Sequence, residues 1–234
     1  MYDPVETELS YSYLSKLQEE CTELRWALLG GWAVYLQVQE KYQRAFGREY
    51  LRSRDIDLYI GAADQAKLAE VIRKLQFAAS AYPFRYELIY EREEKRILST
   101  KEAKRKPIFN LIYLFLDVFS DKETKAVGSW VFPELQRVEL EFMQKTPVLS
   151  ISSLLHLKTN AFFQREKLDK ELKDACDIYA LLFYSNNKAN ITIPLRKAIE
   201  KIISRVDLQK FIAEQVLGDS LKNDLVSYSL RGLL

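Results

Sequence analysis

The sequence predicts an α+β fold, in which a mixed β-sheet flanked by helices is followed by a C-terminal helical bundle. Two observations predict it. Short apolar runs with strand periodicity alternate with amphipathic helical segments as far as residue 147, whereas helical periodicity alone continues from Ser150. We therefore expect two domains, residues 1–147 and residues 148–234.

The first two strands are expected to alternate with helices. Apolar residues at helical spacing predict a helix over Glu6–Glu20, and the apolar run Arg25–Leu29 predicts a strand that ends in a glycine turn before the next helix. Ile56–Ile60 is predicted to be a strand that ends at Gly61. Asp64 is predicted to cap the amphipathic helix that follows.

Three further strands are predicted before the helical half. They are Tyr86–Tyr90, Ile108–Ser120 and Arg137–Met143. The charged stretch Glu91–Lys106 between the first two is predicted to be an exposed hairpin extension, and Thr146-Pro147 is predicted to end the strand pattern.

Three helices are predicted in the second half. The first contains Leu154, Leu155, Ala161 and Phe162, the second contains Leu172, Ala175, Tyr179 and Leu182, and the third is Pro194–Val206, with proline in its first turn. The lone His156 lies among leucines, so we interpret it as a packed residue.

Composition is typical of an ordinary globular protein. Of the 234 residues, 48% are hydrophobic and 29% charged, which is enough for a substantial core. The two cysteines are far apart in sequence, which argues against a disulfide framework or a thiolate zinc site. No run approaches the length of a membrane span and the first ten residues lack an apolar core, so we expect a cytoplasmic protein without membrane contact.

A net charge of +2 does not by itself indicate a nucleic-acid binder. Positive charge is nevertheless clustered, first at Lys41, Arg44, Arg48, Arg52 and Arg54, and then at Lys101, Lys104, Arg105 and Lys106. The second cluster is either solvated surface or a contact to phosphate or RNA.

Three carboxylates carry the main chemical signal. Asp55 and Asp57 are two apart on a predicted strand, so their side chains share one face and can reach one Mg²⁺. Asp117 lies on a later strand, where it could bridge to a second metal ion in a two-metal displacement at phosphorus. Gly30 and Gly31, at the turn into a helix, would let backbone amides approach phosphate oxygens. Asp121 is the alternative third carboxylate, although its position suits a turn.

This order of glycine pair, Asp-Ile-Asp and later aspartate resembles the polymerase-β-like nucleotidyltransferase superfamily. The gap from Gly31 to Asp55 is longer than in minimal members. The chain also contains Gly-Gly-Trp-Ala-Val, Arg-Ser-Arg-Asp-Ile-Asp-Leu and a later helical motif. In this order the motifs look like those of the AbiEii-type nucleotidyltransferases of abortive infection and toxin–antitoxin pairs. The helical motif comprises Lys158, Arg165, Lys173, Asp174, Asp177 and Ile178.

The resemblance implies an enzyme that uses Mg²⁺ or Mn²⁺ to transfer a nucleoside monophosphate from an NTP to a hydroxyl group. The acceptor would be tRNA or other RNA, a protein or a small molecule, and a toxin would have a cognate antitoxin. Asp55, Asp57 and Asp117 would be the metal-binding catalytic residues. The alternative is a catalytically silent nucleotide sensor or scaffold of the same fold.

The helical motif would line the cleft from the helical domain. By resemblance, Lys158 and Arg165 would hold triphosphate oxygens, and Asp174 would position one of those cations or act as a base. Arg54 could contact phosphate as well, although an arginine beside aspartates is as often a structural ion pair. The competing interpretation of the helical motif is a set of interhelical salt bridges that fixes helix register.

Overall fold

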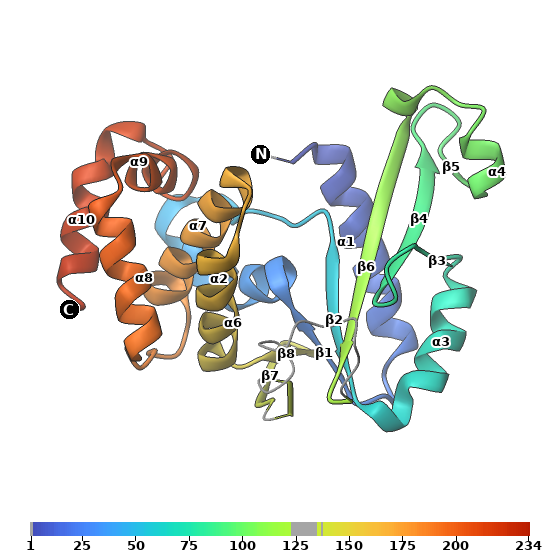
Figure 1. Ribbon diagram of the computed structural model, residues 1–234, viewed down its shortest axis with the longest axis horizontal. Helices are drawn as coiled ribbons and strands as arrows, with labels where there is room; N and C mark the ends of the chain where they lie inside the picture. Colours follow the sequence, from blue (N-terminus) through green and yellow to red (C-terminus); the bar gives the residue numbers. More distant parts are fainter. Residues whose placement is uncertain (1, 123–134, 137) are drawn as a thin grey trace. The chain divides into compact units, whose positions relative to one another are not determined.

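The structure, a computed structural model, describes residues 2–122, 135–136 and 138–234 (Figure 1). The chain forms two units. The first comprises residues 1–32, 52–137 and 144–148, and the second comprises residues 33–51, 138–143 and 149–234. This division differs from the predicted one at residue 147, because residues 33–51 and 138–143 lie with the helical segments.

A mixed sheet forms the centre of the first unit. Its strands are β1 (Trp26–Leu29), β2 (Ile56–Ile60), β3 (Ala78–Ala79), β4 (Arg85–Glu91), β5 (Arg96–Leu98), β6 (Leu111–Ser120) and β8 (Thr146–Leu149). They are ordered β3-β4-β6-β2-β1-β8, with β5 beside β4. The central pair β2 and β6 is parallel, whereas β1 pairs antiparallel with β2 and β4 pairs antiparallel with β6. The predicted mixed sheet is confirmed.

Helix α1 (Pro4–Glu20) begins where the sequence provides both a cap and a first-turn proline. The side chain of Asp3 accepts a hydrogen bond from the Val5 amide at 2.8 Å, and Pro4 needs no amide partner at this position. Leu14 and Leu17 are buried, and the helix lies along β6 in Figure 1.

The segment after β2 differs from the prediction in its capping. A short 3-10 turn, η1 (Ala62–Asp64), precedes helix α3 (Gln65–Lys74). Asp64 stands at the N-cap position but makes no side-chain cap bond; its Oδ2 instead accepts from the Arg25 amide at 2.9 Å. The carboxylate therefore ties α3 to the start of β1.

The predicted hairpin extension contains more structure than its charge suggested. Strands β4 and β5 form an antiparallel hairpin, and α4 (Thr100–Ala103) follows. Ser99 and Glu102 form a capping box at α4, with Ser99 Oγ accepting from the Glu102 amide at 3.3 Å and the Ser99 amide donating to Glu102 at 2.8 Å. The predicted strand from Ile108 begins as the 3-10 turn η2 (Ile108–Asn110), so β6 starts at Leu111.

The second unit is helical. It contains most of α2 (Gly30–Phe46), strand β7 (Leu140–Met143), α6 (Ile151–Gln164), α7 (Leu168–Tyr184), α8 (Ile193–Ser204), α9 (Val206–Gln215), η3 (Ser220–Lys222) and α10 (Asn223–Arg231). Within this unit α2 is anchored by Tyr42, whose hydroxyl donates to the Val216 carbonyl at 2.6 Å, and by Lys41, whose ammonium donates to the Ser185 carbonyl at 2.7 Å. These contacts place α2 with the helical unit.

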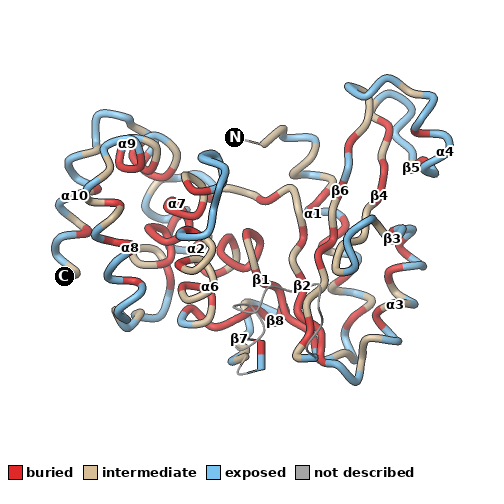
Figure 2. The backbone as a smooth tube through the Cα atoms, viewed as in Figure 1, coloured by how far each residue is buried: buried red, intermediate tan, exposed pale blue. Residues whose placement is uncertain are grey.

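Burial follows the amphipathic pattern of each element. Figure 2 colours β1 and β2 almost wholly as buried, whereas the later helices alternate between buried and exposed residues. Ile199, Ile202, Ile212, Val226 and Leu230 are fully buried, so the last three helices close one apolar core.

Two boundaries require correction. Thr146-Pro147 does not end the strand pattern but begins β8, which pairs with β1 through Val148. The third predicted helix stops at Ser204, because Arg205 is extended (φ −115°, ψ 102°) and α9 begins after it. Of the predicted strand Arg137–Met143, Arg137 lies outside the described residues and β7 forms from Leu140.

Among the helices that the structure describes, none is both long and apolar enough to cross a membrane.

We predict that neither cysteine reacts in the folded protein. Cys21 and Cys176 are both free and buried, and burial raises the pKa of Cys21 to about 12 and that of Cys176 well above its usual range. Since the thiolate is the reactive form, an aromatic disulfide reagent at pH 8 should release almost no chromophore from native protein. In guanidinium chloride it should release two equivalents per chain. One rapid equivalent from native protein would contradict the prediction.

Candidate active site

The register of the sheet brings two predicted carboxylates together. Asp57 on β2 pairs with Asp117 on the parallel neighbour β6, and on its other side Asp57 pairs with Leu29 on β1. Residues in register on adjacent strands point to the same face, so the two carboxylates lie side by side. Asp117 is 7% exposed and therefore sits in a largely enclosed position.

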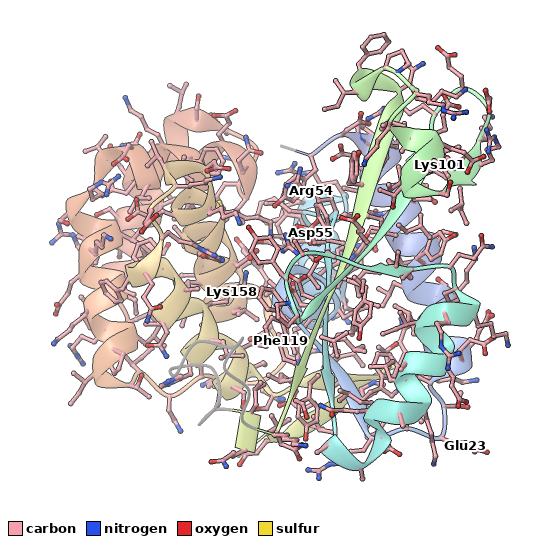
Figure 3. The ribbon with its side chains drawn as sticks, turned by 45° about the vertical axis from the view of Figure 1, so that its right-hand side comes forward. Glu23, Arg54, Asp55, Lys101, Phe119 and Lys158 are labelled. Carbon is pink, nitrogen blue, oxygen red and sulfur yellow. The ribbon has the colours of Figure 1, made fainter. Side chains whose placement is uncertain are left out.

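Asp55 adds a third carboxylate to this part of the sheet. It immediately precedes β2 and is two residues from Asp57, the spacing at which strand side chains return to one face. Figure 3 shows Arg54 beside Asp55, and Arg54 Nε lies 3.6 Å from Asp55 Oδ1. Arg54 also stacks over the Tyr2 ring at 5.2 Å. Arg54 thus contributes a positive charge at the edge of the acidic group.

Gly30 brings the start of α2 against Asp57. The backbone of Gly30 has φ +65°, and a Cβ built there would lie 1.9 Å from Asp57 Oδ2. Only glycine accommodates both the left-handed backbone and the close carboxylate. The indole of Trp32 donates to Ser10 Oγ at 2.9 Å, which fixes the first turn of α2. Gly30, Gly31 and Trp32 therefore begin a helix whose N-terminal amides open beside the carboxylates.

Arg85 is a site residue that the sequence analysis missed. It pairs with Asp117 across β4 and β6, and its Nε and Nη2 donate to Asp117 Oδ1 and Oδ2, both at 2.7 Å. The guanidinium also stacks on the Phe115 ring at 4.5 Å. These hydrogen bonds raise the pKa of Arg85, and the charges of Asp55 and Asp57 contribute to the rise. Because Arg85 reaches Asp117 from another strand, the residues around Arg85 in the sequence do not indicate this contact.

Asp55 and Asp57 fit a divalent cation best. Carboxylate oxygens are the ligands that Mg²⁺ prefers, and one or two protein carboxylates are usual when substrate phosphates supply the rest. The lack of a side chain at Gly30 lets the start of α2 approach the Asp57 carboxylate closely. Within the described ranges, no three His, Cys, Asp or Glu side chains are grouped to hold one metal ion. The three-carboxylate centre stays a prediction, and Asp117 is bound to Arg85 here.

Asp121, the alternative third carboxylate, has a structural position. It follows Ser120, which pairs with Ile60 rather than with Asp57. Its Oδ1 accepts from the Ala62 amide at 2.8 Å and its Oδ2 from the Tyr59 hydroxyl at 3.2 Å. Asp121 therefore supports the turn after β2, three pairs along the strand from Asp57.

The helical motif forms an ion-pair network inside the second unit. Lys158 Nζ lies 3.0 Å from Asp174 Oδ1 and 2.7 Å from Asp177 Oδ2, and Arg165 Nε donates to Asp174 Oδ2 at 2.8 Å. The hydroxyl of Tyr50 donates to Asp177 at 3.0 Å. Asp174 and Asp177 are almost fully buried. These contacts are those expected of interhelical salt bridges, and the nucleotide role of Lys158, Arg165 and Asp174 stays a prediction.

Charge pairing holds this network in its ionised form. Burial disfavours the ammonium, yet Asp174 and Asp177 outweigh burial and raise the pKa of Lys158. Burial likewise works against the Asp177 carboxylate, but Lys158 and Lys173 outweigh it and lower the pKa of Asp177. A lowered acid pKa stabilises the fold until the pH falls below about 4, and a raised lysine pKa stabilises it until the pH rises above about 10.

The two basic clusters differ in their contacts. In the first, Arg48 donates to the Val216 carbonyl at 3.2 Å within the second unit, whereas Arg52 lies 2.6 Å from Glu8 within the first. In the second, Lys106 is paired with Glu94, while the exposed members are Lys101, Lys104 and Arg105. Both clusters therefore present exposed cations, which are Lys41, Arg44 and Arg48 in the first and Lys101, Lys104 and Arg105 in the second.

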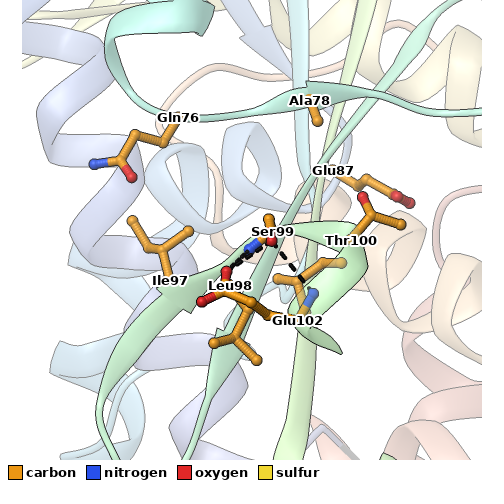
Figure 4. A pocket seen from close by; sticks show the side chains of 9 residues that line it. Gln76, Ala78, Glu87, Ile97, Leu98, Ser99, Thr100 and Glu102 are labelled. Atoms are coloured by element: carbon orange, nitrogen blue, oxygen red, sulfur yellow. Dashed lines mark hydrogen bonds between the residues drawn. The ribbon is translucent and has the colours of Figure 1, made fainter. Parts of the chain in front are cut away.

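A pocket of about 310 Å³ lies elsewhere in the first unit, between β3, β4, β5 and α4 (Figure 4). Its lining includes Glu87, Ile97 and Ser99, and Ser99 is hydrogen bonded to Glu102 in its wall. None of the predicted site residues lines it, so it is separate from the carboxylates.

Gly30→Ala should destabilise the fold through the Asp57 contact. A left-handed alanine costs about 1–2 kcal/mol, and the 1.9 Å approach adds to that cost. Gly47→Ala is the matched control, because Gly47 has the same φ of +65° but nothing within 4 Å of the added Cβ. Denaturant unfolding should show a larger loss for Gly30→Ala. Equal losses would contradict the close contact.

Lys158→Met should lower the free energy of unfolding by up to about 3–5 kcal/mol, because it removes a cation shared by two buried aspartates and leaves Asp174 with Arg165 and Asp177 with Lys173. The control is Lys201→Met. Lys201 pairs with Glu171 at 2.6 Å, but its side chain is 32% exposed, so its loss should cost about 1 kcal/mol or less. Chemical denaturation measures both. A change in nucleotide affinity at unchanged stability would instead support the predicted phosphate role.

Comparison with known proteins places the fold. No protein-family model and no curated protein matches the chain. JHP933 from Helicobacter pylori is similar with a TM-score of 0.54 and 11% identity, over 97% of this chain and 93% of that one. An antigenic nucleotidyltransferase-like protein from Paracoccidioides brasiliensis has a TM-score of 0.49 and 18% identity, over 90% and 93%. The lincosamide antibiotic adenylyltransferase LnuA, bound to lincomycin, has a TM-score of 0.42 and 16% identity, over 76% and 98%. The chain thus shares its α+β fold with JHP933.

Proposed function

We propose that this protein is a metal-dependent nucleotidyltransferase that moves a nucleoside monophosphate from an NTP to an acceptor hydroxyl. One observation carries the proposal: Asp57 and Asp117 are in register on parallel strands, with Asp55 two residues away and the start of α2 packed on Asp57. Carboxylates beside a helix N-terminus combine a cation site with a phosphate site. The motif order supports the nucleotidyltransferase superfamily, and AbiEii-type membership remains part of this proposal.

Each residue has a role that follows from its position. Asp55 and Asp57 would hold Mg²⁺ or Mn²⁺, which when bound neutralises phosphate charge. The first amides of α2, from Gly30 and Gly31, would donate to triphosphate oxygens, and the Arg54 guanidinium would face the same charge. Asp117 retains lone pairs beyond those that Arg85 uses, so it would accept a hydrogen bond from the acceptor hydroxyl and orient it.

The chemistry is an in-line displacement at the α-phosphorus. The acceptor oxygen forms a bond to phosphorus, the bond to the pyrophosphate oxygen breaks, and the hydroxyl proton passes to Asp117 or to water. Holding the two reactants beside each other supplies much of the rate enhancement in phosphoryl transfer.

RNA is our proposed acceptor class. Lys101, Lys104 and Arg105 are exposed close to Ile108 and Phe109, which are 79% and 75% exposed. Clustered cations beside an exposed aromatic side chain suit a single-stranded backbone with stacked bases. A protein or small-molecule acceptor, and a toxin role with a cognate antitoxin, are compatible with the same chemistry.

One observation favours a second candidate, a nucleotide-binding sensor without catalysis. Both Asp117 oxygens accept hydrogen bonds from Arg85, which is the contact expected if Asp117 has only a structural role. Such a protein would bind metal–nucleotide through Asp55 and Asp57 without transferring the nucleotide.

Transfer should depend on the paired aspartates. The assay contains Mg²⁺, each α-labelled NTP in turn, and total RNA or cell extract. Wild type should label an acceptor. The rate of labelling should fall about 100-fold or more in Asp55→Asn/Asp57→Asn, because the phosphate charge is no longer neutralised. Asp121→Asn is the matched control: it removes a carboxylate from the turn after β6 and should keep near-wild-type transfer. Nuclease and protease treatment of the labelled product identifies the acceptor class.

The outcomes separate the two candidates. Equal labelling by wild type and the double variant would contradict the assigned site. Metal-dependent nucleotide binding without transfer to any acceptor would favour the sensor.

A further inference from the structure

Arg85 sits where an arginine is unexpected in a site of three carboxylates. The sheet register places Arg85, Asp117, Asp57 and Leu29 in one row across β4, β6, β2 and β1. Backbone pairing therefore sets Arg85 beside Asp117 on one face of the sheet. The two hydrogen bonds to Asp117 then place the guanidinium against the carboxylate.

The contact is stronger than an ordinary surface ion pair. Both Asp117 oxygens accept from the fork of Arg85 at 2.7 Å, and the side chains are 26% and 9% exposed. Such bidentate pairs combine charge with fixed geometry. The Phe115 ring at 4.5 Å covers the guanidinium face. The Val118 amide donates to the Phe84 carbonyl at 2.7 Å and holds the two strands together next to the pair. These contacts hold the guanidinium in one place.

We propose that Arg85 takes the place of a second cation on Asp117, so that the site binds one divalent ion, through Asp55 and Asp57. This inference rests on the proposed function and deepens it. It modifies the two-metal expectation from the sequence, in which Asp117 would also be a metal ligand. In this arrangement Asp117 and Arg85 act as a positioning pair: the arginine holds the carboxylate, and the carboxylate faces the acceptor.

Charge balance is the physical reason. Three neighbouring carboxylates repel one another; Arg85 beside Asp117 and Arg54 beside Asp55 offset part of that charge, so one divalent ion is enough to neutralise the rest. A second divalent ion beside Asp117 would be repelled by the fixed positive charge of Arg85, which lies against both carboxylate oxygens. Loss of that positive charge should therefore open a second, weaker cation site.

The test is a count of bound Mn²⁺ on the full chain, read from the electron paramagnetic resonance signal of free Mn²⁺ during titration without nucleotide. Wild type should bind one Mn²⁺ per chain, and Asp55→Asn/Asp57→Asn should lose it. Arg85→Gln should bind two, or bind the second at least tenfold more tightly than wild type. Arg85→Lys keeps the charge and should remain at one.

Arg92→Gln is the matched control. Arg92 lies just after β4 and pairs with Asp3 at 2.6 Å, and its side chain is 29% exposed against 26% for Arg85. Arg92→Gln removes the same charge at a position away from the carboxylates, so it should still bind one Mn²⁺ per chain. Circular dichroism checks that each variant is folded. If Arg85→Gln fails to fold, a count of two Mn²⁺ in wild type or in Arg85→Lys would still overturn the proposal.

The failure of this inference differs from the failure of the proposed function. Two Mn²⁺ per wild-type chain, both dependent on Asp55 and Asp57, would overturn the role of Arg85 and leave the proposed enzyme intact. One Mn²⁺ per chain in folded Arg85→Gln, without tighter binding of a second ion, would also overturn the role of Arg85. So would two Mn²⁺ per chain in Arg85→Lys. No Mn²⁺ bound by wild type would overturn the metal site itself and the inference with it.

Discussion

The parallel pairing of β2 with β6 is the constraint on which the candidate site depends. It sets Asp57 beside Asp117, and the antiparallel pairing of β2 with β1 places the end of β1, and hence Gly30, at the same row. A slip of one residue in either pairing would turn the side chains to the opposite face. The site is therefore a consequence of register, and the buried neighbours Ile56, Leu58 and Ile60 enforce that register by filling the core.

Local sequence was enough to predict the parts of the site that one segment determines. The glycine pair after an apolar run predicts a strand-to-helix turn, which the fold contains, and Asp57 lies on the predicted strand whereas Asp55 immediately precedes it. Asp117 on the neighbouring strand was also correctly placed. Arg85 was missed because its role arises only when β4 lies antiparallel to β6, and nothing in the residues around Arg85 specifies that partner. Likewise, Pro147 predicted a break in the strand pattern, but it is the second residue of β8. The strand tolerates the proline there because its pairing with β1 is made at Val148.

The helical motif shows why residue order alone leaves a role open. A lysine, an arginine and two aspartates at helical spacing satisfy either a phosphate site or an interhelical ion-pair network. The structure supplies burial and distances, with Asp177 fully buried and bound by Lys158 and Tyr50. Tyr50 lies in the segment 33–51, so this network also ties that segment to α7 and explains why the unit boundary differs from the predicted one. Sequence separation conceals such a contact.

The difference between the two ion-pair systems is chemical as well as structural. Lys158 is shared by two nearly buried aspartates whose remaining partners are also protein groups, so that network is closed on itself. Arg85 donates two hydrogen bonds to Asp117, and the charges of Asp55 and Asp57 also raise its pKa. The carboxylate group around Arg85 therefore retains net negative charge, and like charges held close together favour binding of a cation. With Arg85 beside Asp117 and Arg54 beside Asp55, one divalent ion is enough to neutralise the charge that remains. Arg85 also relieves the repulsion at Asp117, which is the most enclosed of the three carboxylates.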